Sequence, residues 1–86
     1  MEIIKNFLNE SGIVKSWPSK RSKKEKVLEY LATKFEKDKI YTEKEINEIL
    51  NQWHTFNDSP LLRRELYEYK YLDREKDCSK YWVRIP

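Results

Sequence analysis

The amino-acid sequence predicts a single, mainly α-helical domain with a small β-hairpin, a winged helix-turn-helix with an extra N-terminal helix. Capping boxes of the form Ser/Thr-x-x-Glu, at Ser22 and Thr42, each open a stretch with apolar residues at helical spacing. A third helix start is marked by Pro60 after two residues that commonly cap helices. The β-rich runs YLDRE and KYWVRI then surround the polar stretch KDCS, which indicates a hairpin.

The elements follow one another closely along the chain. Apolar residues at helical spacing, with Gly12 behind them, predict a first helix over about residues 2–10. The segment GIVKSWP is expected to be extended, because Pro18 disfavours helix at the residue before it. Further helices are expected near 22–37, 43–54 and 59–70, with KIYT as a short strand between the first two. We assign residues 1–15 to the N-terminal helix and linker and 16–86 to the core.

Composition favours a folded protein with a heavily charged surface. Charged residues make up 38% of the chain, against about 25% in average domains. Cys78 is the only cysteine, so an internal disulfide is excluded. No apolar run approaches the roughly 20 residues of a membrane-spanning helix, and no secretory signal is recognisable. We therefore expect a cytoplasmic protein with no membrane partner.

Catalytic and metal-binding patterns are not recognisable. His54 is the only histidine, and one histidine with one cysteine falls short of a tetrahedral zinc site. Cys78 would act as a nucleophile only if the fold brought it beside His54. The single glycine excludes a glycine-rich phosphate loop. We expect no enzyme activity, no metal and no cofactor.

Positive charge is concentrated in the stretch SWPSKRSKKEK, where five of the seven residues from Lys20 to Lys26 are cationic. Lysines in the first turn of a helix oppose the helix dipole, and each costs about 0.3–1 kcal/mol. Charge placed where the fold disfavours it indicates a polyanionic partner. The alternative is a solvated lead into a helix. The residues expected to contact phosphate are Lys20, Arg21, Lys23 and Lys24.

The third helix of DNA-binding winged helices enters the major groove. With Leu62, Leu66 and Tyr69 turned inward, the opposite surface is expected to present Arg63, Arg64 and Tyr67, with Ser59 at its start. Arginine matches the O6 and N7 atoms of guanine. Glu65 and Glu68 would repel phosphate, and an Arg64–Glu68 pair on a solvated helix face is the alternative interpretation.

The hairpin offers Lys76 and Lys80 at or near its tip, where a wing would touch backbone phosphate, although three acidic residues dilute this charge. Trp82 could stack on a base, but tryptophans in a small domain usually lie in the core. The same expectation applies to Trp17 and Trp53.

The chain from Trp17 to Trp82 resembles the bacterial domain of unknown function 2087, through the stretches PSKR, YTEKEINEIL, LLRREL and YLDR…YW. The resemblance implies a winged-helix-like fold that occurs alone or joined to helix-turn-helix regulators. That family usually has glycine where this chain has Lys70. Lysine in a left-handed conformation loses about 1 kcal/mol. We therefore expect Lys70→Gly to raise the melting temperature.

Two classes of function remain open at this point. The first is nucleic-acid binding, to duplex DNA above all and with RNA as a further candidate, in transcription regulation. The second is a protein-interaction module, either a homodimer or a complex with a regulator protein. Its contact face would come from Ile3, Ile4, Phe7 and Leu8 of the N-terminal helix, unless these residues pack onto the core of their own domain.

Overall fold

The computed structural model describes residues 2–84, with side chains from Ile4 onward, so expectations for the Ile3 side chain and for Ile85 lie outside the described residues. The chain forms a 3₁₀ helix, three α-helices and an antiparallel hairpin, so the predicted class, mainly α with a small hairpin, is confirmed. The elements are η1 (Glu2–Phe7), α1 (Arg21–Ala32), α2 (Glu43–Asn51), α3 (Ser59–Glu68), β1 (Leu72–Arg74) and β2 (Tyr81–Val83).

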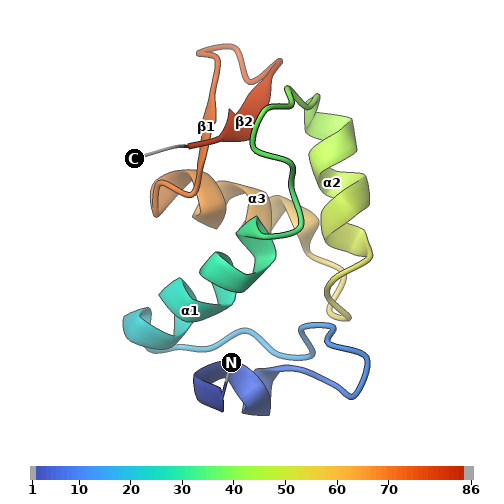
Figure 1. Cartoon of the computed structure of the whole chain (residues 1–86), viewed down its shortest axis with the longest axis vertical. Helices are drawn as coiled ribbons and strands as arrows, with labels where there is room; N and C mark the ends of the chain where they lie inside the picture. Colours follow the sequence, from blue (N-terminus) through green and yellow to red (C-terminus); the bar gives the residue numbers. More distant parts are fainter. Residues whose placement is uncertain (1, 85–86) are drawn as a thin grey trace.

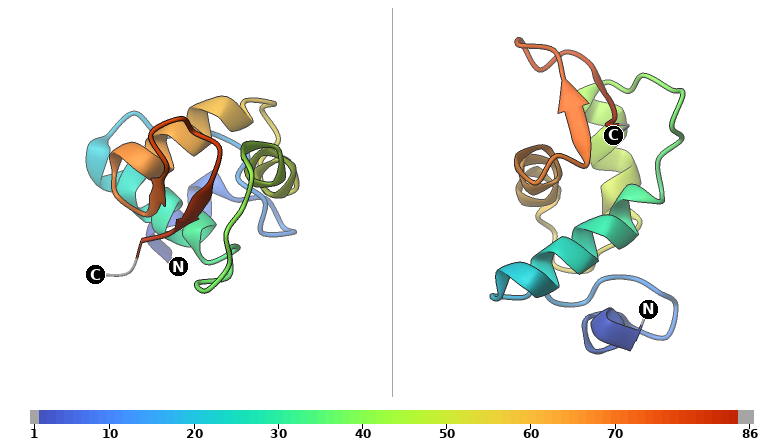
Figure 2. Two further views of the ribbon diagram at one scale, coloured as in Figure 1. Left: turned by 90° about the horizontal axis from the view of Figure 1, so that it is seen from above. Right: turned by 60° about the vertical axis from the view of Figure 1, so that its left-hand side comes forward.

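The helices enclose the core, and the hairpin and η1 lie at opposite ends of the molecule (Figure 1). One view in Figure 2 looks along α3 while α1 and α2 run across it, so the helices cross rather than form a parallel bundle. Every helix and both strands contribute to the buried core, which consists of Ile4, Val14, Val27, Leu28, Leu31, Phe35, Tyr41, Ile46, Leu50, Leu62, Leu66, Leu72 and Tyr81.

The N-terminal segment is built differently from the expected α-helix. It forms the 3₁₀ helix η1, and Ile4 at 1% exposure belongs to the core. Gly12 has a φ of 77°, and its carbonyl accepts a hydrogen bond of 2.5 Å from the hydroxyl of Tyr30 in α1. Val14 is bound to the segment that follows α2, through backbone hydrogen bonds with Trp53 and Thr55. The segment is therefore integrated into the domain.

The start of α1 differs from the prediction, because Ser22 does not form a capping box. The helix begins at Arg21, and Lys20 at the N-cap makes no side-chain cap hydrogen bond. Glu25 instead accepts from Arg21 Nε, 3.3 Å away, one turn earlier. The helix also ends at Ala32 rather than near Lys37.

The predicted capping box of α2 is confirmed, although α2 ends at Asn51 rather than His54, and of the two residues expected to start α3 the cap is Asp58. Thr42 and Glu45 form the reciprocal capping box. Asp58 caps α3 by accepting from the N–H of Leu61 at 3.3 Å. His54 fastens the two helices together: Nδ1 lies 2.7 Å from the Leu50 carbonyl, and Nε2 accepts from the Asp58 N–H at 2.8 Å.

The end of α3 has the hydrogen-bond pattern of a Schellman motif. The N–H of Lys70 donates to the Tyr67 carbonyl at 3.0 Å, and the N–H of Tyr71 donates to the Leu66 carbonyl at 2.9 Å. Lys70 has a φ of 67°, the left-handed conformation in which glycine is favoured. The expected left-handed position at Lys70 is thus confirmed.

The hairpin pairs Asp73 with Trp82, and the expected strand KIYT is reduced to one bridging residue. Tyr41 exchanges two backbone hydrogen bonds, of 2.7 and 2.8 Å, with Tyr81 at the far edge of β2. On the outer edge of β1 the N–H of Arg74 is bound by the Asp73 carboxylate at 2.8 Å.

Candidate nucleic-acid interface

The predicted base-contacting face of α3 is largely engaged within the protein. Ser59 is buried at 7% exposure, so its side chain is not on the surface as predicted. It lies on the core-facing side with Leu62 and Leu66, one helical turn apart from each other. Arg64 is exposed, as predicted, and within residues 2–84 it forms no ion pair.

Arg63 is tied to α2, so the expectation that both arginines face solvent is wrong for this residue. Its Nη1 donates to Asn47 Oδ1 at 2.5 Å, and its Nη2 lies 3.4 Å from Glu43 Oε1. The Arg63 side chain is only 18% exposed, whereas that of Glu43 is 48% exposed. Arg63 lies on the flank of α3 that faces α2, where Asn47 and Glu43 present acceptors one turn apart.

Tyr67 is covered by an arginine that sequence analysis did not single out. The guanidinium carbon of Arg74 lies 4.0 Å from the centre of the Tyr67 ring. Hydrogen bonding with the Tyr81 side chain raises the pKa of Arg74 above its ordinary value. The sequence pattern could have revealed the Arg74–Tyr81 contact, since residues paired across a hairpin have side chains on the same face of the sheet and Arg74 is paired with Tyr81.

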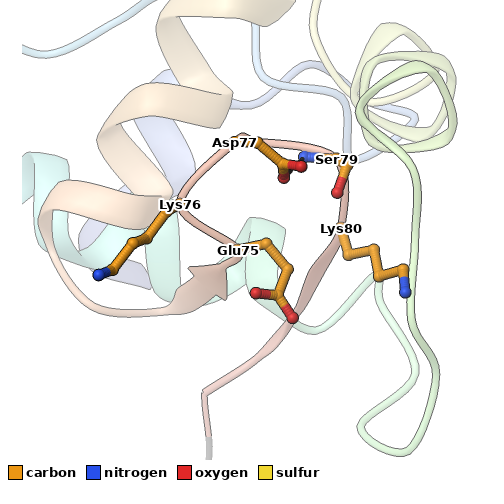
Figure 3. Close-up of a pocket in the computed structure, with 5 residues that line it drawn as sticks. All are labelled: Glu75, Lys76, Asp77, Ser79 and Lys80. Atoms are coloured by element: carbon orange, nitrogen blue, oxygen red, sulfur yellow. Dashed lines mark hydrogen bonds between the residues drawn. The ribbon is translucent and has the colours of Figure 1, made fainter.

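The two lysines of the hairpin tip do not converge on one point. They line a shallow pocket of about 430 Å³ together with Glu75, Asp77 and Ser79. Figure 3 shows Lys76 and Lys80 extending to opposite sides of the loop, with Glu75 between them. Hydrogen bonds from the side chain and backbone N–H of Ser79 lower the pKa of Asp77, so this carboxylate stays ionised beside the lysines.

The remaining predicted residues gather at the first turn of α1. Lys20 and Arg21 are exposed, and Lys23 and Lys24 are half-buried. This turn contains no acidic residue, and its first N–H groups receive no side-chain cap. An uncapped helix start directs free N–H groups and a positive dipole end toward solvent. Here four cationic side chains add to that field, and one of them, Arg21, is paired with Glu25 at 3.3 Å.

Half-buried aromatic rings flank this turn on two sides. The Arg21 guanidinium lies 5.3 Å from the centre of the Tyr69 ring at the end of α3. The ammonium of Lys24 lies 6.0 Å from the Trp17 ring, which belongs to the segment leading into α1. In Figure 1 the start of α1 lies between the C-terminal end of α3 and this leading segment.

We define the α1-start surface as these four cations, the two rings and the neighbouring exposed Lys70. The segment that follows α3 is held to α1 by the hydroxyl of Tyr71, which donates to the Glu25 carbonyl at 3.2 Å. Burial, followed by the charges of Glu29 and Glu25, raises the pKa of Tyr71, so the donor keeps its proton. The residues that form the surface are Trp17, Lys20, Arg21, Lys23, Lys24, Tyr69 and Lys70.

The tryptophans are only partly in the core. Trp17 and Trp53 pack against it without being fully buried. Trp82 instead lines a shallow pocket of about 390 Å³ with the loop of residues 37–40. Ile40 in that loop is 61% exposed, and among residues 4–84 it is the large hydrophobic side chain that lies on the surface.

Both nitrogens of His54 are used in hydrogen bonds within the fold, and Cys78 lies in the hairpin turn. Among residues 2–84, no group of three or more His, Cys, Asp or Glu side chains is placed to hold a metal ion. Over the same residues, every helix is too short or too polar to span a membrane.

Residues 13–83 match the domain of unknown function 2087, described as an uncharacterized protein conserved in bacteria. The chain belongs to this family. Searches of curated proteins and of solved structures give no match.

The domain of unknown function 2087 covers the whole α1-start surface, from Trp17 to Lys70, and both strands. The helix η1 lies outside the matched residues, although Ile4 belongs to the same hydrophobic core. The cations and rings that we consider for ligand binding are therefore all within the family region.

Proposed function

We propose that this domain is a cytoplasmic winged-helix module that binds nucleic acid through its phosphate backbone and serves in transcription regulation. The observation that carries the proposal is the first turn of α1, where four cations surround a helix start with neither an acidic residue nor a side-chain cap. Phosphate at this position would meet ammonium groups and free N–H groups together. The proposal assigns the domain binding and no catalysis.

The α3 face contributes less to this proposal than the sequence suggested. Phosphate contacts position a protein on nucleic acid, whereas base contacts specify the sequence. Arg63 and Tyr67 are engaged by Glu43, Asn47 and Arg74, which leaves Arg64 as the exposed arginine of the helix. Backbone binding with weak sequence preference is the function that this arrangement supports.

The test is a fluorescence-anisotropy titration with labelled random-sequence oligonucleotides at several salt concentrations. Log affinity should fall linearly with log salt, by about 0.9 per neutralised phosphate for a duplex and about 0.7 for a single strand. The variant Lys20→Gln/Lys23→Gln should weaken binding. It should also reduce the magnitude of this slope by about 1.8 for a duplex or about 1.4 for a single strand, because two phosphate contacts are lost. The matched control Lys37→Gln/Lys44→Gln removes the same charge from exposed positions elsewhere.

The outcomes separate clearly. If both double variants weaken binding equally, net charge rather than the α1-start surface is responsible. Circular dichroism should show that the Lys20→Gln/Lys23→Gln domain is folded and at least as stable as the parent, because cations at a helix start oppose its dipole. Absence of binding at low salt would end the proposal.

A protein-interaction module is the second candidate, and Ile40 favours it. The apolar N-terminal residues expected to form a dimer face are used internally, since Ile4 is buried and Phe7 and Leu8 pack against the core. Ile40 beside Trp82 offers the exposed apolar contact instead. Light scattering that shows a dimer, dissociated by Ile40→Glu, together with no nucleic-acid binding, would favour this candidate.

A further inference from the structure

The α1-start surface combines positive charge with aromatic rings whose cation contacts are loose. Cation–π attraction extends to about 6 Å from a ring centre. Arg21 over Tyr69 at 5.3 Å and Lys24 over Trp17 at 6.0 Å lie near that limit. By contrast, Lys34 lies 3.9 Å from the Trp53 centre and Arg74 lies 4.0 Å from the Tyr67 centre.

This difference decides which rings can receive a ligand. A planar base needs about 3.5–4 Å between carbon atoms to stack on a ring. At Trp53 and Tyr67 a cation already occupies that distance. At Tyr69 and Trp17 the cations are farther away. Lys24 can turn toward a phosphate while a base takes the Trp17 ring, and Arg21, whose Nε is paired with Glu25 at 3.3 Å, leaves room for a base on Tyr69 beside its guanidinium. These rings and cations are brought together by α1, the end of α3 and the leading segment.

Duplex DNA fits this arrangement less well than a single strand does, because its bases are stacked on one another and present only their edges. Reading those edges would fall to α3, where Ser59 is buried, Arg63 is bound to α2 and Tyr67 is covered. Proteins that bind single strands use cationic grooves with aromatic side chains on which bases stack. The α1-start surface has both components.

We infer that the nucleic acid bound at the α1-start surface is single-stranded, with one base stacked on Tyr69 beside the planar guanidinium of Arg21 and another on Trp17. The inference rests on the proposed function and adds the class of nucleic acid. Lys20 and Lys23 contact the phosphates between these bases. Stacking tolerates any base, so little sequence preference is expected.

The experiment compares three labelled ligands of one sequence and about 12 nucleotides, a length within the usual footprint of single-strand binders. The ligands are single-stranded DNA, single-stranded RNA and the DNA duplex, titrated by anisotropy at the same two salt concentrations. Both single strands should bind at least about tenfold more tightly than the duplex, a difference of about 1.4 kcal/mol. A difference between the RNA and DNA strands would report contact with the 2′-hydroxyl, and either order supports the inference.

Variants locate the stacked base. Tyr69→Leu should weaken single-strand binding by about 5- to 100-fold, whereas Tyr69→Phe should retain it, because the ring rather than the hydroxyl stacks. Tyr67→Leu is the matched control on the same helix and should leave single-strand affinity unchanged. Arg21→Lys keeps the charge at a side chain that is 78% exposed. It should still weaken single-strand binding, since lysine lacks the planar guanidinium.

Three results would overturn the inference. Duplex binding as tight as single-strand binding would remove it while leaving the proposed function intact. Equal single-strand affinity for the parent and for both Tyr69→Leu and Arg21→Lys would show that phosphate contacts alone are involved. No binding of any ligand at low salt would end both the inference and the proposed function.

Discussion

Replacing Lys70 with glycine removes a backbone strain at the end of α3. Lys70 occupies the left-handed position of the Schellman motif, with a φ of 67°. Its side chain is exposed, so the substitution loses little packing. A left-handed backbone costs an L-residue about 1–2 kcal/mol, and glycine relieves this cost in the folded state. The greater conformational freedom of glycine in the unfolded chain opposes this by about 0.5–1 kcal/mol. We expect a net stabilisation of about 0.5–1 kcal/mol.

The assay is thermal and urea unfolding followed by circular dichroism. For a domain of this size, 1 kcal/mol corresponds to about 4–8 °C, so the melting temperature should rise by about 2–8 °C. Lys70→Ala should give no such gain, because alanine bears the same left-handed strain. Lys76→Gly, at an exposed turn position without positive φ, should be neutral or destabilising. A Lys70→Gly domain no more stable than the parent would refute the strain argument.

Three further changes test other contacts. Gly12→Ala should lower stability by at least about 1–2 kcal/mol in urea unfolding, because a Cβ there would lie 2.9 Å from the Tyr30 hydroxyl at a φ of +77°; wild-type stability would contradict the geometry. The pKa of Tyr71 is raised in the folded state, so its contribution to stability is complete below about pH 10 and is lost as pH rises through the folded pKa. Tyr71→Phe should therefore reduce the fall in the free energy of unfolding at alkaline pH. An unchanged dependence of that free energy on pH would exclude Tyr71 as its source. Arg63→Ala should cost about 1–2 kcal/mol by loss of its charge-assisted contacts with α2, whereas Arg64→Ala should change stability by no more than about 0.5 kcal/mol; equal effects would contradict the assignment.

Local signals in the sequence predicted the elements well where a single side chain determines the backbone. Thr42 and Asp58 cap their helices as expected because a cap bonds only residues two or three positions away. The same kind of signal failed at Ser22, where Glu25 satisfied an i, i+4 contact with Arg21 instead of closing a box. Both arrangements fit the sequence, and the backbone N–H groups of this turn are left without a side-chain cap.

The candidate site was harder to predict because its contacts cross between elements. Helical phase places Arg63 on the flank of α3, but the packing of α2 decides that Asn47 lies within hydrogen-bonding distance. The cationic run at the start of α1 is visible in the composition, and Trp17 lies beside it in the sequence. Tyr69 comes to the same place only through the folding of α3 against α1.

The carboxylate of Asp73 has a consequence for the behaviour of the protein at high concentration. An exposed strand edge with free N–H groups is a template on which another chain can add a strand. Asp73 already binds the outward N–H of Arg74, and Tyr41 occupies the far side of β2. The hairpin therefore offers few vacant backbone donors for growth into filaments. Loss of the Asp73 carboxylate, for example by substitution with alanine, would be detected first as self-association in concentrated samples, ahead of any large fall in melting temperature.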